Sequence, residues 1–181
     1  MSLNNLKLVD PRSFTQEDFD VSGPIFVESA DMRGFFGFGI RLRTKSNFNH
    51  SMMMRQPGLI CSQNLFYKEV PIEQYMKPGM ILKFWVCQDI TAVEKRYIQH
   101  KIKRDLAKPW YKRFYDFPGV VGQLFGMRWF NISWLNYCSE RVARKVRVIL
   151  PSLRRYPTPE DIEIEFKRSR RMKILGYWFK P

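Results

Sequence analysis

Short apolar runs, each bounded by turn residues, predict a set of β-strands. The clearest signal is a hairpin, because two apolar segments flank the dipeptide Pro57-Gly58, a common turn between antiparallel strands. Gly23-Pro24 marks the start of an earlier strand in the same way. The predicted strands cover residues 23–27, 51–55, 59–63, 80–87 and 172–179.

A different spacing predicts helices in the second half of the chain. Between Thr91 and Pro109, apolar side chains recur every three or four residues with lysines and arginines on the other faces, which is typical of an amphipathic helix. The same spacing predicts a helix over residues 138–148. Thr158-Pro159 supplies the cap and the first position of a third, shorter helix.

The remaining segments have no clean period. Residues 1–22 are interpreted as a polar lead-in, residues 31–40 as a loop rich in glycine and phenylalanine, and residues 108–135 as a long connection with some helical pieces. A chain of 181 residues is short for two full domains. We therefore expect one α+β domain over residues 23–181, with a small antiparallel sheet packed against helices.

The charge balance favours an anionic neighbour. The sequence has 31 lysines and arginines against 17 aspartates and glutamates, a formal net charge of +14. Nucleic acid, anionic lipid and an acidic cell-wall polymer all suit such a charge, and the charge does not choose among them. The basic residues gather at 101–104, 141–147, 154–155 and 167–171, with several aromatic residues at 110–115.

Cysteine usage and the chain start exclude several classes. The three cysteines, Cys61, Cys87 and Cys138, are an odd number without CxxC spacing, so we expect no disulfide framework, no metal site and no cofactor. The first residues lack the pattern of an export signal, and no run of about 20 apolar residues occurs. These features predict a cytoplasmic protein, or one delivered by a phage or a secretion system.

Candidate catalytic residues are few. Of the two histidines, His100 lies among basic residues on the amphipathic helix and is expected to be solvated, whereas His50 precedes a strand that could hold its ring rigidly. Cys138 begins a predicted helix, where the dipole and free N–H groups stabilise a thiolate and could bind an oxyanion. Plainer interpretations are a packed or capping histidine and a small buried cysteine.

Five segments in a fixed order carry a resemblance to a known group. The chain resembles the circularly permuted branch of the NlpC-type papain-like superfamily, and most closely its YiiX-like group. The matching segments are GPIFV at 23–27, IRLRTKSNFNH at 40–50, KPWY at 108–111, NYCSERV at 136–142 and PEDI at 159–162. Pro24 stands where the group usually has aspartate, and SMMM follows His50 where HVGI is common.

The resemblance implies a permuted papain-like fold with a nucleophile at a helix N-terminus. In this order Cys138 would be the nucleophile and His50 its general base. The third residue, which orients the imidazole, would lie at or beside Ser62, with Gln63 and Cys61 as the neighbouring choices, although the group often has glutamate or histidine there. Tyr137 would help to bind the oxyanion or would pack beside the helix.

Two functions from different classes remain open. The first is a thiol hydrolase or acyltransferase of the cysteine-peptidase kind, which would act on a cell-wall peptide amide or an acyl-lipid ester through an acyl-enzyme. The second is a weakly active or inactive papain-like scaffold that binds an anionic partner. For that partner a polymer or membrane surface is favoured, and nucleic acid is less expected.

Overall fold

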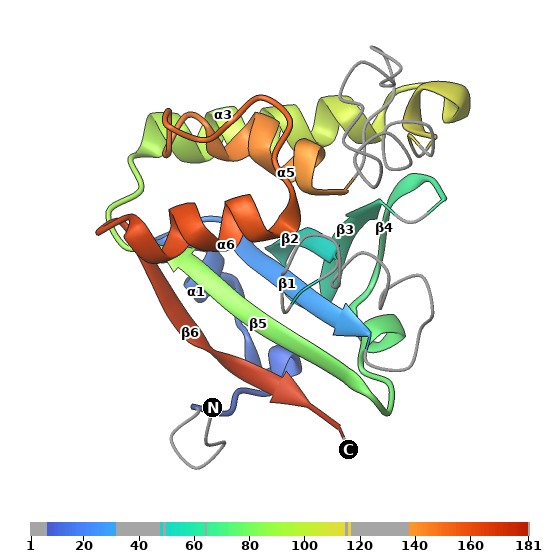
Figure 1. The fold of residues 1–181 in the computed structure, drawn as a ribbon, viewed down its shortest axis with the longest axis vertical. Coiled ribbons are helices and arrows are strands. Elements are labelled where there is room, and N and C mark those ends of the chain that lie inside the picture. Colours follow the sequence, from blue (N-terminus) through green and yellow to red (C-terminus); the bar gives the residue numbers. More distant parts are fainter. Residues whose placement is uncertain are drawn as a thin grey trace.

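The chain folds around a six-stranded antiparallel sheet with the strand order β4-β3-β2-β1-β5-β6 (Figure 1). The computed structural model describes residues 7–31, 48, 50–63, 65–114, 116 and 138–180. The strands are β1 (Ile25–Asp31), β2 (His50–Gln56), β3 (Leu59–Gln63), β4 (Tyr67–Pro71), β5 (Met80–Cys87) and β6 (Met172–Phe179). With four α-helices in the described part of the chain, this architecture confirms the α+β class.

Helices cover the two faces of the sheet unequally. One face lies under α3 (Ala92–Leu106), α5 (Cys138–Val146) and α6 (Pro159–Arg168), and we call it the helical face (Figure 1). The opposite face packs against α1 (Gln16–Ser22) and the short 3-10 turns η2 (Pro11–Ser13) and η3 (Ile72–Tyr75), and we call it the α1 face. A further turn, η4 (Trp110–Arg113), follows α3.

Strand alternation assigns each β2 side chain to one of these faces. Met53 belongs to the core of the helical face, whereas Met52 and Met54 belong to the core of the α1 face. Successive side chains of a strand point to opposite sides of the sheet. Ser51 therefore shares the helical face with Met53, and His50 shares the α1 face with Met52.

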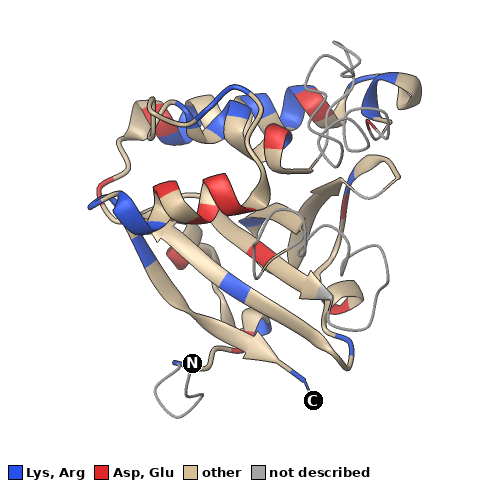
Figure 2. Ribbon diagram, in the orientation of Figure 1, with Lys and Arg blue, Asp and Glu red and all other residues tan. Residues whose placement is uncertain are grey.

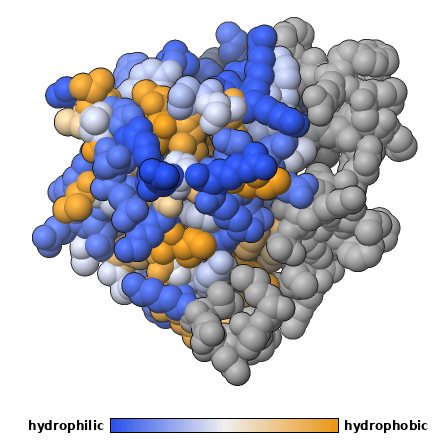
Figure 3. All heavy atoms as spheres, turned by 60° about the vertical axis from the view of Figure 1, so that its left-hand side comes forward, coloured by the Kyte–Doolittle hydropathy of each residue, from blue (hydrophilic) through white to orange (hydrophobic). Residues whose placement is uncertain are grey.

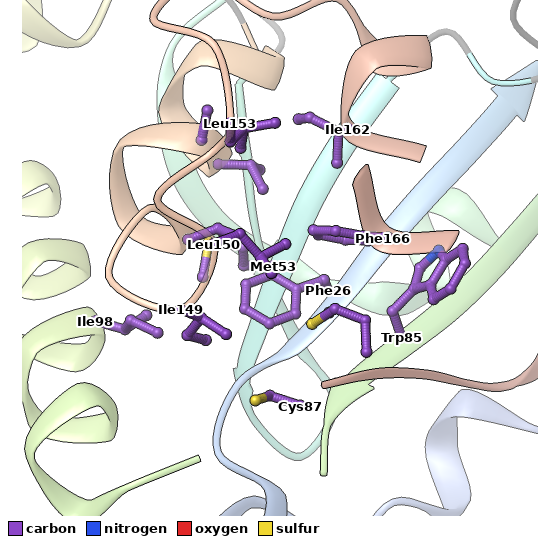
Figure 4. Packing of buried hydrophobic residues seen from close by; sticks show 14 of the residues in the cluster. Phe26, Met53, Trp85, Cys87, Ile98, Ile149, Leu150, Leu153, Ile162 and Phe166 are labelled. Atoms are coloured by element: carbon purple, nitrogen blue, oxygen red, sulfur yellow. The ribbon is translucent and has the colours of Figure 1, made fainter. Parts of the chain in front are cut away.

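The hydrophobic core of the helical face joins sheet and helices. Phe166 from α6 packs edge to face against Phe26 and Trp85, with ring centroids 5.6 and 5.5 Å apart. Figure 4 shows these rings together with Met53 from β2 and Ile98 from α3 converging between the layers. This packing holds the helices on the sheet, because each large buried side chain contributes about 2 kcal/mol.

Local signals account for the element ends. Thr91 and Thr158 each accept a hydrogen bond from the backbone three residues on, and the side chains of Glu94 and Asp161 complete the two capping boxes. Gly58 turns the β2–β3 hairpin at φ 69°, in the left-handed region that favours glycine.

Most of the predicted elements are confirmed, and two were missed. Predicted strands 80–87 and 172–179 match β5 and β6, and the three predicted helices match α3, α5 and α6. The polar lead-in 1–22 was an incomplete interpretation, since α1 lies within it and buries Phe19 in the core. Strand β4 was not predicted at all. Asp31, which the sequence placed in the loop at 31–40, instead ends β1; the rest of that loop and most of the connection at 108–135 lie outside the described residues.

Candidate functional site

His50 sits at the start of β2, with its imidazole on the α1 face. Its Nε2 atom lies 2.9 Å from Ser62 Oγ, and Ser62 Oγ is also hydrogen-bonded to the hydroxyl of Tyr75. The Tyr75 ring stacks on the imidazole with centroids 6.1 Å apart and an interplanar angle of 16°. The structure thus places Ser62 beside the imidazole, in the slot expected for an orienting residue. Tyr75 completes this group, and sequence reasoning missed it.

The environment of His50 favours a neutral ring. Part of the residue remains exposed, but desolvation by burial lowers the pKa of the imidazole from 6.5 to about 4. At neutral pH the ring is therefore uncharged. A thiolate–imidazolium ion pair, which activates many catalytic cysteines, needs the charged ring.

Cys138 is the first residue of α5 and is buried over the helical face. It lines a small enclosed space with no room for a water molecule, together with Ser51, Cys61 and Gln63 from the sheet and Arg141 from α5. These sheet residues have the same strand parity as Met53, which fixes their side chains on the helical face.

The structure does not bring the Cys138 thiol and the His50 imidazole together. Ser62 and Tyr75 hold the imidazole on the α1 face, while Cys138 lies over the helical face with Ser51 and Gln63. The sheet itself lies between the two groups. The physical reason is the two-residue period of a strand, because one position along β2 changes the face to which a side chain points.

The other expected site residues have separate partners. Gln63 Oε1 accepts a hydrogen bond from Arg141 Nε, and its amide nitrogen donates to the Arg113 carbonyl at 2.9 Å, so the structure engages it away from the imidazole. Burial raises the pKa of the Cys61 thiol to about 12. Tyr137 lies outside the described residues.

A row of polar side chains crosses the helical face. Glu28 in β1 pairs directly with Ser51 in β2 and with Lys83 in β5, and all three side chains are buried. Trp85 Nε1 donates to Glu28 Oε2 at 2.8 Å, and Lys83 Nζ donates to Glu163 Oε1 at 3.0 Å. Within the described ranges, Glu28 Oε1 and Ser51 Oγ have no hydrogen-bond partner. Sequence reasoning missed this row, although single polar residues in apolar strands are its signal.

This row predicts a pH dependence of stability. Burial raises the pKa of Glu28 from 4.5 to about 8, against the opposing charge of Lys83 and with a smaller contribution from Glu163. A folded-state pKa above the unfolded value means that stability is present at low pH and is lost as pH rises through about 8. We expect Glu28→Gln to remove this loss, so that the variant gains roughly 3 to 4 kcal/mol of stability relative to the wild type as pH rises from 5 to 8. Urea unfolding across this pH range measures the difference, and two parallel pH profiles would contradict it.

A second buried charge network ties α5 to α3. Asp105 on α3 accepts hydrogen bonds from Lys145 at 2.8 Å and from Lys108 at 2.6 Å, and the guanidinium of Arg141 lies 3.7 Å away. Burial alone would raise the pKa of Asp105, but Lys145 and Lys108 hold it well below its usual range. Arg141 and Lys145 are therefore structural residues, and the basic surface expected over residues 141–147 is reduced by their burial.

The outward side of α3 carries cations of a different kind. Arg96, Lys103 and Arg104 are exposed at helical spacing, and Lys101 is partly exposed beside them. No ion pair engages these four side chains in the part of the chain that the structure describes. Figure 2 shows basic segments repeated along this helix.

A second basic region lies at the end of α6 and the start of β6. Lys167 pairs with Glu163 at 2.7 Å, and Arg168 lies 3.9 Å from Glu165, whereas Arg170 and Lys173 are exposed. Figure 3 shows hydrophilic side chains over much of the neighbouring face, with separate hydrophobic areas between them. Acidic neighbours thus compensate this region more than they compensate α3.

Comparisons with known proteins give a likeness in fold. No family model matches the chain, and no curated protein matches it. A solved structure with a similar fold is that of the metalloprotein YiiX from Escherichia coli O157:H7, with a TM-score of 0.57 and 15% sequence identity. The alignment covers 87% of this chain and 97% of YiiX. The expected resemblance to the YiiX-like group is thereby supported at the level of the fold.

In the described ranges, no group of three or more His, Cys, Asp or Glu side chains is arranged to hold a metal ion. Among the helices described, none is long and apolar enough to cross a bilayer.

Proposed function

We propose that this chain is a YiiX-like scaffold that binds an anionic polymer or surface and does not depend on cysteine–histidine hydrolysis. The observation that carries the proposal is the contrast between its two sets of cations. Buried acids neutralise Lys83, which joins the sheet to α6 through Glu163, and Lys145, which joins α5 to α3 through Asp105. The cations on the outward side of α3 have no such acid in the described structure and remain available to a partner.

We also propose that the α+β fold is a permuted papain-like fold. A permuted papain-like arrangement is supported by the order of the five segments and by Cys138 at the start of a helix on the sheet. In this proposal the chain has the permuted papain-like fold but lacks a working pair of Cys138 thiol and His50 imidazole, since Ser62 and Tyr75 contact the imidazole.

Binding to heparin, a generic polyanion, tests the proposal. We expect retention at low salt and a loss of affinity of about a hundredfold or more between about 50 and 200 mM salt, because cations that contact a polyanion release its counterions. Titration at several salt concentrations measures the slope. His50→Ala is the matched control and should bind as the wild type does. Absence of binding at about 50 mM salt would contradict the proposal.

A thiol hydrolase remains the second candidate, because one observation favours it. The hydrogen bond between His50 Nε2 and Ser62 Oγ leaves Nδ1 to face another group, as in a catalytic imidazole that is oriented by its neighbour. This candidate requires a conformation in which Cys138 reaches the α1 face. Turnover of an activated ester that is lost in both Cys138→Ala and His50→Ala would support it, and turnover unaffected by either change would exclude it.

A further inference from the structure

We propose that the outward side of α3 together with η4 binds single-stranded nucleic acid. This α3–η4 face is defined by Arg96, Lys103, Arg104, Trp110, Tyr111 and Lys112. The inference rests on the proposed anion-binding function and names its partner and its surface. The face combines exposed cations with exposed aromatic rings, the two features that a single strand requires.

The spacing of the exposed basic side chains on α3 matches the spacing of phosphates along a single strand. Arg96, Lys103 and Arg104 lie on one stripe of α3, because they are seven and eight residues apart. At a rise of 1.5 Å per residue the stripe is about 12 Å long, which spans roughly three to four phosphates of a stacked strand. His100 is also exposed between the two ends of this stripe.

The aromatic residues lie where the stripe ends. Trp110 is 63% exposed and Tyr111 is 53% exposed, which is unusual for such large rings. Phe66 contacts the indole edge to face at a centroid distance of 6.3 Å, and Tyr111 contacts it at 6.1 Å. These contacts hold the indole in place while much of its surface stays open to a stacking base.

Other lysines of η4 and α3 lie close to aromatic rings. Lys112 Nζ lies 6.0 Å from the centroid of Tyr111, and Lys101 Nζ lies 5.0 Å from that of Tyr97 farther along the helix. A phosphate bound by Lys112 would therefore place its own base beside the exposed rings of Trp110 and Tyr111. Every base has a π-face, so this arrangement favours single strands without strong sequence preference.

The geometry favours nucleic acid over a membrane. An interfacial helix buries its apolar side in the lipid, but the apolar side of α3, with Ile98 and Ile102, is buried in the core of this protein. Val93 is the exposed aliphatic residue on the outward stripe. The phenylalanines of residues 35–38, which would favour a membrane, lie outside the described residues. A duplex is disfavoured as well, because its bases are not free to stack on Trp110.

Fluorescence anisotropy with a labelled 20-nucleotide oligothymidine tests the inference. We expect the double variant Trp110→Ala/Tyr111→Ala to bind about 10- to 100-fold more weakly than the wild type, because each lost stacking contact weakens binding. We expect the triple variant Arg96→Gln/Lys103→Gln/Arg104→Gln to lose affinity by a similar factor and to show a shallower salt dependence. A matched control, Arg168→Gln/Arg170→Gln/Lys173→Gln, removes the same charge elsewhere and should change affinity less than threefold.

The outcomes separate the inference from the function on which it rests. If the two triple variants lost equal affinity for the oligonucleotide, or if the double variant bound it as the wild type does, the α3–η4 face would not be its binding site. Heparin binding by the wild type would still support the proposed function in that case. Binding to vesicles of phosphatidylglycerol and phosphatidylcholine without binding to the oligonucleotide would overturn the nucleic-acid partner alone. Failure to bind heparin as well would overturn both. Thermal unfolding of each variant shows whether it is folded, and all substituted residues are exposed.

Discussion

Replacement of Asp105 by alanine is expected to lower the free energy of unfolding by about 3 to 5 kcal/mol. Asp105 is the shared acceptor for Lys145 and Lys108 and faces Arg141 at 3.7 Å. Without it, the Arg141 guanidinium loses the acid that it faces between α3 and α5, and Lys145, whose pKa burial already lowers to about 8, must either give up its proton or stay charged without its acceptor. Leaving a buried charge uncompensated is strongly destabilising. Equilibrium unfolding in urea at neutral pH measures the loss.

Asp10→Ala is a suitable control for this prediction. Asp10 pairs with Arg12 at 2.5 Å, but both side chains are largely exposed. Surface pairs of this kind contribute little because water and salt screen them. We therefore expect almost no change in the unfolding midpoint. If Asp105→Ala lost no more stability than Asp10→Ala, the buried network would not be holding α5 on α3.

Trp85→Ala is expected to cost about 3 to 5 kcal/mol as well, for a different reason. The indole packs on Phe166 at a centroid distance of 5.5 Å, and Lys83 Nζ lies 4.2 Å from the centroid of the Trp85 ring. Its removal leaves a large cavity between β5 and α6. It also removes the hydrogen bond that Trp85 Nε1 donates to Glu28, whose carboxyl group has one oxygen without a partner among the described residues.

Trp85→Phe separates the two contributions. The phenyl ring fills most of the space but has no N–H, so it loses the hydrogen bond to Glu28 and keeps most of the packing on Phe166. We expect a loss of about 1 to 3 kcal/mol, smaller than that of alanine. A Phe variant as unstable as the Ala variant would mean that packing contributes little here. Calorimetric unfolding of both variants decides the matter.

Sequence patterns were sufficient for elements with strong local signals. Pro57-Gly58 identified the β2–β3 hairpin, and Thr158-Pro159 identified the start of α6. Helix α1 was missed because Phe19 is its single buried residue and its other residues, apart from the exposed Val21, are polar, so no apolar stripe marks it. Strand β4 was missed because Tyr67 and Val70 are its fully buried side chains, too few for a clear alternation.

The site was harder to predict than the fold. Segment order placed Ser62 beside His50, which the structure shows, but it carried no information on the face of β2 to which either side chain points. The run Met52-Met53-Met54 places apolar side chains on both faces of the strand, so no hydrophobic alternation in the sequence shows which face His50 shares. To predict the polar row at Glu28, one must know the register between neighbouring strands, and no local sequence pattern contains it.

Thiol alkylation shows whether the sheet separates the Cys138 thiol from the His50 imidazole. The rate at which iodoacetamide modifies Cys138 is followed by peptide mass spectrometry from pH 5 to pH 9, in the wild type and in His50→Ala. We expect the same pH profile in both proteins, with rates that agree within about twofold, because the imidazole is on the α1 face and does not influence the thiol. Fast alkylation near neutral pH in the wild type that His50→Ala slows by about tenfold or more would contradict it.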